Sequence, residues 1–284
     1  MNANTAKICI WGFRNGRYDT FRHIHEAFYR TLKFMGRNVI WVDRGSDLSG
    51  IDWKDTFFLS QNIVFERDIE KIPLREDCFY CVHNGFPAAI WPAIKGLKTM
   101  GFLVMWATDL LPPEIEANKP SRVFCSDSKV INYVGSLWEY NREELGIFGQ
   151  ISWENGILFR VAGSSLGPVS IEENVRLIRE SYMAPALQGS YQIGVNYIPC
   201  RLWKNISYGQ WPVVNSRAAY EVVDGQAIFN SDCRQLFLDA QKKLPQVPLA
   251  DLYRLMDFVA EKHTYLNRLK NLFAEAQRIL EEKS

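Results

Sequence analysis

The sequence predicts an α/β protein in which short buried strands alternate with amphipathic helices. Two observations support this fold class. Short apolar runs recur along the chain, and between them apolar residues are spaced as on one face of a helix. The chain has 284 residues, 47% of them hydrophobic, which is enough for two domains of about 140 residues with separate cores. Strands alternating with helices form parallel sheets joined by right-handed crossovers.

The first series of elements occupies residues 1–126. An apolar run at 7–13 leads into a polar loop, a helical pattern at 21–36 and a second strand at 38–43. Further strands are expected at 56–60, 78–83, 102–107 and 122–126, with a helix at 88–100. This is the pattern of a Rossmann-like domain.

The second series occupies residues 127–284, so we place the domain boundary between residues 126 and 127. Ser170 and Glu173 form a capping-box pattern at the start of one helix. The series has fewer strands than a full doubly wound domain. The elements expected here are strands at 130–135, 157–163 and 212–215, helices at 141–156, 171–184 and 202–209, and a long C-terminal helix at 249–284.

Composition and charge exclude several classes of protein. The formal net charge is +1, which argues against a nucleic-acid partner. The N-terminal stretch lacks the pattern of a signal peptide, and no run approaches the ~20 apolar residues of a membrane span. We therefore expect a cytoplasmic protein, and leave open a peripheral contact of the C-terminal helix with the inner membrane. Cys78 and Cys81 form a C-x-x-C inside an apolar run, so we interpret them as buried thiols rather than metal ligands.

Two cations in an apolar segment indicate an anion site. Arg201 and Lys204 are three residues apart, so they share a face at the start of the expected helix, where backbone N–H groups are free. Such an arrangement suits a phosphate or diphosphate. The alternative is that both side chains solvate an exposed helix end. Apolar neighbours such as Tyr197 and Trp203 favour the anion site.

The same segment resembles the donor-binding region of GT-B glycosyltransferases, in which two Rossmann-like domains face each other across a cleft. The shared motif is Gly-x-x-Pro-Val-Val, here 209–214. The sequences at 22–25, 181–189 and 204–209 also resemble a group of bacterial and viral surface-polysaccharide transferases. Residues 202–205 resemble the donor motif of α1,3-fucosyltransferases, with a spacing that differs by one residue.

The resemblance implies a glycosyltransferase that moves a hexose or deoxyhexose from a GDP- or UDP-linked sugar to a glycan or lipid-linked acceptor. Many retaining GT-B enzymes carry two glutamates at positions where this chain has Asn196 and Lys204, so their mechanism does not carry over. The chain contains no Asp-x-Asp motif, so we expect no metal site and no cofactor. The residues expected to bind the donor nucleotide are Gly163, Ser164, Tyr197, Arg201, Lys204, Asn205, Ser207, Tyr220 and Glu221.

Candidate bases lie near the carboxyl ends of the expected strands of the first domain, where ligands bind in open α/β sheets. An inverting transfer needs a base for the acceptor hydroxyl, and histidines and carboxylates are the usual choices. We assign this catalytic role to His23, His25 and Asp109, and place Arg14 and His83 on the acceptor side. The alternatives are capping, turn-forming or buried polar roles.

Two other functions fit the same pattern. A protein with this fold can bind a nucleotide or sugar without transferring it. A nucleotide-sugar epimerase or hydrolase would consume the donor without an acceptor. Transfer is preferred through the family resemblance.

Overall fold

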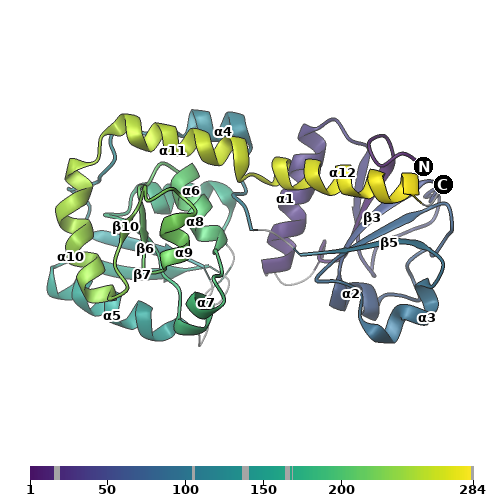
Figure 1. Ribbon diagram of the computed structural model, residues 1–284, viewed down its shortest axis with the longest axis horizontal. Helices are drawn as coiled ribbons and strands as arrows, with labels where there is room; N and C mark the ends of the chain where they lie inside the picture. Colours follow the sequence, from purple (N-terminus) through teal and green to yellow (C-terminus); the bar gives the residue numbers. More distant parts are fainter. Residues whose placement is uncertain (16–19, 104–105, 136–140, 164–166, 168, 283–284) are drawn as a thin grey trace. The chain divides into compact units, whose positions relative to one another are not determined.

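The computed structural model describes residues 1–15, 20–103, 106–135, 141–163, 167 and 169–282, and its chain divides into two compact units (Figure 1). Unit 1 comprises Met1–Met105 and Tyr265–Ser284, and unit 2 comprises Trp106–Thr264. All paired strands in both units run parallel. The predicted α/β class with parallel sheets is therefore confirmed.

Unit 1 is built on a five-stranded parallel sheet with the order β2-β1-β3-β4-β5. Its strands are β1 (Lys7–Trp11), β2 (Val39–Val42), β3 (Thr56–Gln61), β4 (Phe79–His83) and β5 (Lys98–Phe102). Its helices are α1 (Thr20–Phe34), α2 (Asn62–Arg67), η1 (Ala88–Ile90), α3 (Trp91–Ile94) and α12 (Tyr265–Glu282). Because the strand order reverses beside β1, a crevice for ligands is expected at its carboxyl end.

Both faces of this sheet are covered, which explains why its strands read as nearly continuous apolar runs. Successive residues of β3 point to opposite faces. Phe57 stacks on Phe79 with ring centroids 5.0 Å apart, and Phe273 of α12 covers that face at 5.2 Å. Phe58 stacks on Tyr80 at 5.1 Å on the other face.

Unit 2 contains two parallel sheets that abut, one of order β6-β7 and the other β10-β9-β8. A hydrogen bond of 2.7 Å from the Tyr182 N–H to the Val130 carbonyl joins them. The strands are β6 (Val130–Val134), β7 (Leu158–Ala162), β8 (Ala184–Ala186), β9 (Pro212–Val214) and β10 (Ile228–Phe229). The helices are α4 (Pro112–Ala117), α5 (Arg142–Glu154), α6 (Ile171–Arg179), α7 (Ser190–Gly194), α8 (Cys200–Ser207), α9 (Arg217–Glu221), α10 (Cys233–Lys243), η2 (Leu244–Gln246) and α11 (Leu249–Lys262).

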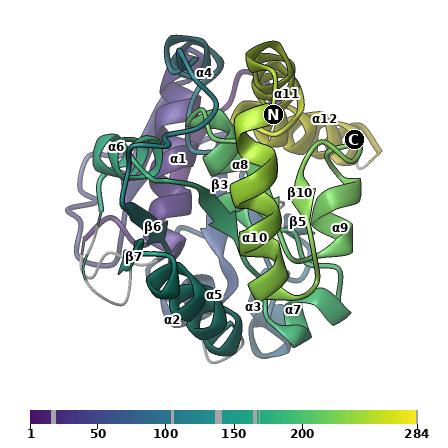
Figure 2. The same ribbon diagram turned by 90° about the vertical axis from the view of Figure 1, so that its left-hand side faces the viewer.

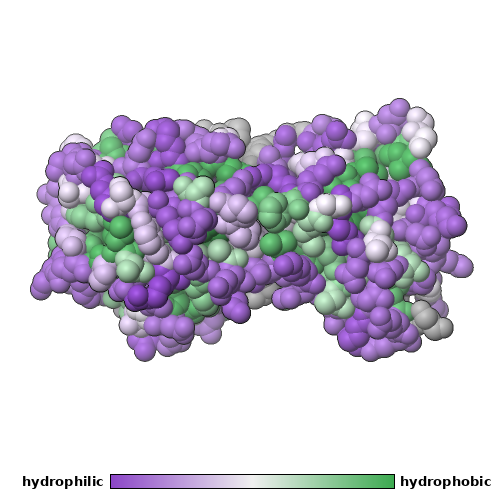
Figure 3. Space-filling view, turned by 90° about the horizontal axis from the view of Figure 1, so that it is seen from above, coloured by the Kyte–Doolittle hydropathy of each residue, from purple (hydrophilic) through white to green (hydrophobic). Residues whose placement is uncertain are grey.

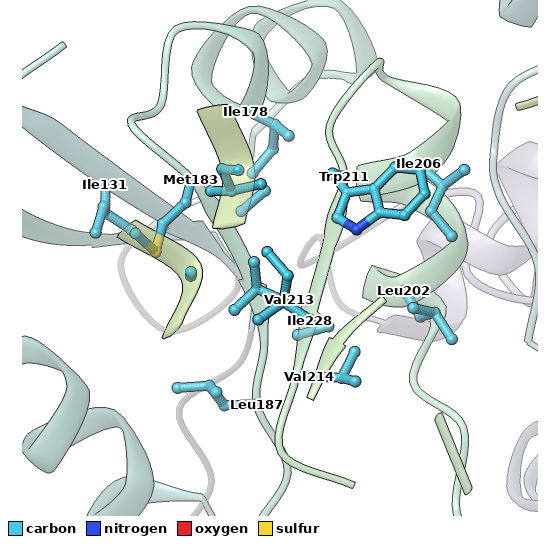
Figure 4. Packing of buried hydrophobic residues seen from close by; sticks show 14 of the residues in the cluster. Ile131, Ile178, Met183, Leu187, Leu202, Ile206, Trp211, Val213, Val214 and Ile228 are labelled. Carbon is cyan, nitrogen blue, oxygen red and sulfur yellow. The ribbon is translucent and has the colours of Figure 1, made fainter. Parts of the chain in front are cut away.

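The core of unit 2 lies between these strands and the surrounding helices. Figure 4 shows Val213 and Val214 of β9 among side chains from β6, α6, α8 and β10. On another side, α5 and α10 pack against each other through Phe148 and Phe237, whose ring centroids are 5.5 Å apart (Figure 2). These contacts give unit 2 a core of its own.

Several predicted elements differ from the structure. In place of the strand expected at 102–107, β5 runs from Lys98 to Phe102, and the described residues that follow it are not in a strand. The expected helix at 88–100 is limited to η1 and α3, because Gly96 adopts a φ of +90° and the next residues pair with β4 as strand β5. The expected strand at 122–126 does not form, and Val123 instead packs into the core of unit 2. The expected helix at 171–184 ends at Arg179, and β8 supplies a strand that the sequence pattern had lacked.

The unit boundary also differs from the predicted division at residues 126 and 127. Leu110, Ile115 and Val123 are buried in the core of unit 2, so the segment from Trp106 onward belongs to that unit. The single C-terminal helix expected at 249–284 consists of α11 and α12, separated at His263 and Thr264. Consequently α11 completes unit 2 and α12 returns to unit 1.

The surface of each unit is mixed in character. Figure 3 shows hydrophilic side chains over much of the face in view, with smaller apolar areas between them. Among the residues that the structure describes, no helix combines the length and apolar character needed to cross a membrane.

Candidate functional site

Arg201, the second residue of α8, lies against the carboxyl end of β6. Its guanidinium carbon is 3.8 Å from the centroid of the Tyr133 ring, and its Nε donates a hydrogen bond of 3.1 Å to the Val134 carbonyl. A cation held over an aromatic face keeps its N–H groups in one plane and in a defined direction. Arg201 is partly exposed, so the structure holds an oriented guanidinium at this edge of the sheet.

Two glycines bring the neighbouring backbone close to this guanidinium. A Cβ atom on Gly135 would lie 1.9 Å from Nη2 of Arg201, and one on Gly163 would lie 2.9 Å from the Gly135 nitrogen. The Gly135 N–H also donates to the Ala162 carbonyl at 2.8 Å. The ends of β6 and β7 therefore approach each other and Arg201 in a space that side chains would fill. The two glycines therefore allow Arg201 to lie directly against the ends of these strands.

The chain reverses direction across the strands of unit 2 at this point. From β6 it runs outward to β7, then returns to β8 beside β6 and continues outward to β9 and β10. In open α/β sheets, ligands bind at the carboxyl ends of the strands where the order reverses. Gly135 and Arg201 lie at that position, so topology and local geometry indicate the same site.

Tyr197 and Gln188 border the site from the β8 side. Burial raises the pKa of Tyr197, with the nearby Cys200 thiol as the next cause and Arg201 opposing it. The Gln188 N–H donates 2.8 Å to Oδ1 of Asn215, its Nε2 donates to the Tyr197 carbonyl, and its Oε1 is buried without a hydrogen-bond partner in the described part of the chain. These bonds fix the loops that follow β8 and β9. The rings of Tyr197 and Trp106 lie 6.4 Å apart.

Sequence reasoning missed Tyr133, Gly135, Gln188 and Asn215. Gly135 carried a usable signal, because a glycine directly after a buried strand often marks a close backbone approach. Tyr133 looked like an ordinary core residue, and only the fold brings Arg201 onto its ring. Gln188 and Asn215 are distant in sequence and meet because their strands are neighbours.

Lys204 and Asp109 form an ion pair inside unit 2, which differs from the separate roles expected for them. Nζ of Lys204 is 3.0 Å from Oδ2 of Asp109, and the Asp109 side chain is 0% exposed. The Tyr208 hydroxyl donates 2.6 Å to the other carboxylate oxygen. Asp109 was expected on the first domain as a base, and the structure instead places it in unit 2 as the counter-ion of Lys204.

The side chains of four other expected donor residues contact other residues of unit 2. Asn205 is buried and donates 2.9 Å to the Ala184 carbonyl, and Ser207 is buried within 2.6 Å of Oγ1 of Thr108. Tyr220 packs on Phe229 with ring centroids 5.4 Å apart. Exposed Glu221 ends α9 and pairs with Arg217, at 2.8 Å between Oε1 and Nε. Ser164 lies outside the described residues.

His25, predicted as a catalytic base, and His83, predicted for the acceptor side, meet in unit 1. Nε2 of His83 and Nε2 of His25 are 3.4 Å apart, and Nδ1 of His25 is 3.0 Å from the Gly12 carbonyl. Since a carbonyl only accepts, Nδ1 of His25 carries the proton, and in its neutral form its Nε2 accepts from His83. Burial, followed by the neighbouring His25, lowers the pKa of His83 to about 2. His83 is therefore a neutral, buried imidazole.

The other two candidates in unit 1, the predicted base His23 and the acceptor-side Arg14, are closer to the surface. His23 is partly exposed on α1. Nη1 of Arg14 donates 2.7 Å to the Trp41 carbonyl at the end of β2. The structure therefore groups His25 with His83, and places Arg14 on a neighbouring loop of the same sheet edge.

The cysteines do not form a metal site in the described residues. Cys78 and Cys81 are buried free thiols, and burial raises the pKa of both. Across the described ranges, no three His, Cys, Asp or Glu side chains are grouped as metal ligands. The C-x-x-C sequence is therefore part of the packing around β4, as interpreted from its apolar context.

A scan against models of protein families and a search of curated proteins both found no match to this chain.

Proposed function

We propose that this protein is a GT-B-type glycosyltransferase that binds a nucleoside-diphosphate sugar at the carboxyl edge of unit 2. The observation that carries the proposal is the Arg201 guanidinium, oriented by Tyr133 and the Val134 carbonyl, beside two glycines that let it lie close to the ends of β6 and β7. Guanidinium groups often bind phosphates through two parallel hydrogen bonds. Among ligand classes, a diphosphate matches this cationic strand end best.

Arg201 would supply the charge that the leaving group needs. When the acceptor hydroxyl attacks the anomeric carbon, the bond to the diphosphate oxygen breaks and negative charge develops on the leaving nucleotide. A preorganised cation aimed at that charge lowers the barrier. Lys204 is held by Asp109, so its role is to fix the position of α8 through a buried pair, and Arg201 makes the direct phosphate contact.

Unit 1 would receive the acceptor, a glycan or a lipid-linked sugar. Its carboxyl sheet edge carries His23, Arg14 and the buried pair of His25 and His83. His23 is the partly exposed imidazole of this group, so it is the base that we assign to the acceptor hydroxyl.

One observation favours the second candidate function, a nucleotide-sugar-binding protein without transfer. His25, His83 and Asp109, three of the five groups considered as bases or acceptor contacts, are buried. A binding protein needs no base. The two functions separate experimentally, because only the transferase releases a nucleoside diphosphate in the presence of an acceptor.

The test is ligand binding to Arg201→Gln. Titration calorimetry with UDP and GDP, with and without EDTA, should show one nucleotide that binds the parent. A charge-assisted hydrogen bond contributes about 1.5–3 kcal/mol, so the variant should bind that nucleotide about tenfold or more weakly. Its affinity for the matching nucleoside, which lacks phosphates, should not change.

Arg217→Gln is the matched control, since it removes an exposed arginine from α9 of the same unit. Circular dichroism and the melting temperature establish that each variant is folded. Equal diphosphate affinity in the parent and Arg201→Gln would refute the assignment of the phosphate site. Binding without release of nucleoside diphosphate from the sugar donor, across a panel of glycan and lipid-linked acceptors, would favour the binding protein.

A further inference from the structure

We propose that unit 1 carries a second anion site, which takes the phosphate of a phosphorylated saccharide. The site is a cavity of about 430 Å³ at the carboxyl ends of β1 and β2. It is lined by Phe13, Asn15, Asp43, Arg44, Gly45 and Arg67. This volume lies in the range of small-molecule sites, about 300–1,000 Å³. The inference rests on the proposed function, because it names the chemical class of the acceptor.

Two guanidiniums reach this cavity from different elements. Arg67 ends α2 and pairs with Asp68 through Nε and Nη2, at 2.7 and 2.9 Å, so its planar group is held in place. Arg44 follows β2 and is exposed, and its guanidinium makes no hydrogen bond or ion pair within the described part of the chain. An arginine fixed by a carboxylate and a second one with free donors can together bind a phosphate.

The acidic residue in the lining, Asp43, is held by hydrogen bonds within the wall of the cavity. Both oxygens of Asp43 accept hydrogen bonds from the loops that follow β1 and β2. They come from the Asn15 N–H at 2.6 Å, the Gly45 N–H at 3.1 Å and the Ser46 hydroxyl at 3.3 Å. The hydrogen bonds accepted by Asp43 therefore hold the two loops that form the wall of the cavity. The ligand meets the guanidiniums of Arg44 and Arg67.

Phe13 gives the cavity an aromatic wall and carries backbone strain. Its φ is +61°, in the left-handed region that is unfavourable for a bulky residue. The ring stacks on Phe21 with centroids 5.5 Å apart and meets the edge of His25 at 5.3 Å. Strain of this kind gathers at binding sites, where the fold holds a side chain in a required position. An aromatic face beside a phosphate site suits the apolar face of a sugar ring.

The ligand that fits is a saccharide with a phosphate, either free or attached to a lipid. The first probe is glucose 1-phosphate, titrated into the full chain and followed by calorimetry. The second is a phosphatidylcholine vesicle that holds a polyprenyl-diphosphate-linked sugar, followed by co-sedimentation. Binding of the first identifies a soluble ligand, and binding of the second alone identifies a lipid-linked one. Glucose without phosphate should not bind.

Arg44→Gln should weaken binding of the responding probe about tenfold or more, because Arg44 donates its free N–H groups to the phosphate. Arg75→Gln is the matched control. It removes the same charge from the same unit, and Arg75, paired with Asp77 at 2.7 Å, precedes β4 at the opposite edge of the sheet. Arg67→Gln is a less specific test, because it also removes the ion-pair partner of the buried Asp68 carboxylate.

Failure of this inference is distinct from failure of the proposed function. If neither probe binds, or if Arg44→Gln binds as the parent does, the second site is refuted. If Arg201→Gln abolishes binding of the probe, the saccharide phosphate occupies unit 2 and the inference is refuted while the nucleotide site stands. The second site is supported if the probe no longer binds to Arg44→Gln but still binds to Arg201→Gln and Arg75→Gln.

Discussion

Replacing His83 by phenylalanine should make unit 1 less sensitive to acid. The His83 ring lies among the rings of Phe21, His25 and Phe102, at centroid distances of 5.6, 5.6 and 5.9 Å, so an aromatic ring of similar size suits the position. Its Nδ1 is buried without a hydrogen-bond partner among the described residues. At pH 7 the substitution removes one hydrogen bond and one unpaired polar atom, so we expect a change within about 1 kcal/mol.

The magnitude of the acid effect follows from the two pKa values of His83. Burial lowers its pKa from 6.5 to about 2, so between these values the unfolded chain binds a proton that the folded chain does not. Above pH 6.5 His83 is neutral in both the folded and the unfolded chain, so it does not change the free energy of unfolding. Below pH 6.5 the free energy of unfolding falls as the pH drops. The slope is about 1.4 kcal/mol per pH unit, which amounts to about 2.5 kcal/mol between pH 7 and pH 4.5.

The assay is urea denaturation of the parent and His83→Phe at pH 7 and pH 4.5. Hydrogen exchange of the peptide that covers β4 reports the opening of unit 1 separately from unit 2. The variant should gain about 2.5 kcal/mol relative to the parent on acidification. His23→Gln is the control, because it removes a partly exposed histidine from the same unit. If the ring signals of His83 titrate in NMR above pH 5, or if the gain is absent, the reasoning is wrong.

Two further predictions concern unit 2. Lys204→Met should destabilise the protein by about 3–5 kcal/mol in urea unfolding, because it leaves the buried Asp109 carboxylate without its ion-pair partner. Adding Asp109→Asn should recover more than half of that loss. A cost below about 1 kcal/mol for Lys204→Met would contradict the buried pair. Gly163→Ala should cost about 2 kcal/mol or more and weaken nucleotide binding in calorimetry, since Gly163 has a φ of +108° and its Cβ would meet the Gly135 backbone. The control Gly146→Ala lies in open space on α5, and should stabilise the helix by about 0.5–1 kcal/mol.

The candidate site could be predicted only in part from the sequence. Arg201 was found because two cations in an apolar segment are unusual, and the structure places it at the reversal of strand order in unit 2. The same reasoning gave Lys204 an equal role. The sequence pattern could not show that Lys204 forms an ion pair with Asp109, which is distant in the chain. Spacing along a helix determines which residues share a face, and only tertiary contacts determine which partner each of them meets.

The sequence by itself determined the α/β class, the parallel strands and most of the strands of unit 1, because buried strands flanked by amphipathic helices leave a periodicity that local sequence preserves. The tertiary structure decided where the units divide, how β8 completes the second set of strands, and why the C-terminal stretch breaks into α11 and α12. It also decided that Gly135, Tyr133 and Arg201 meet. These outcomes depend on contacts between residues distant in the chain, and such contacts leave no periodic trace in the sequence.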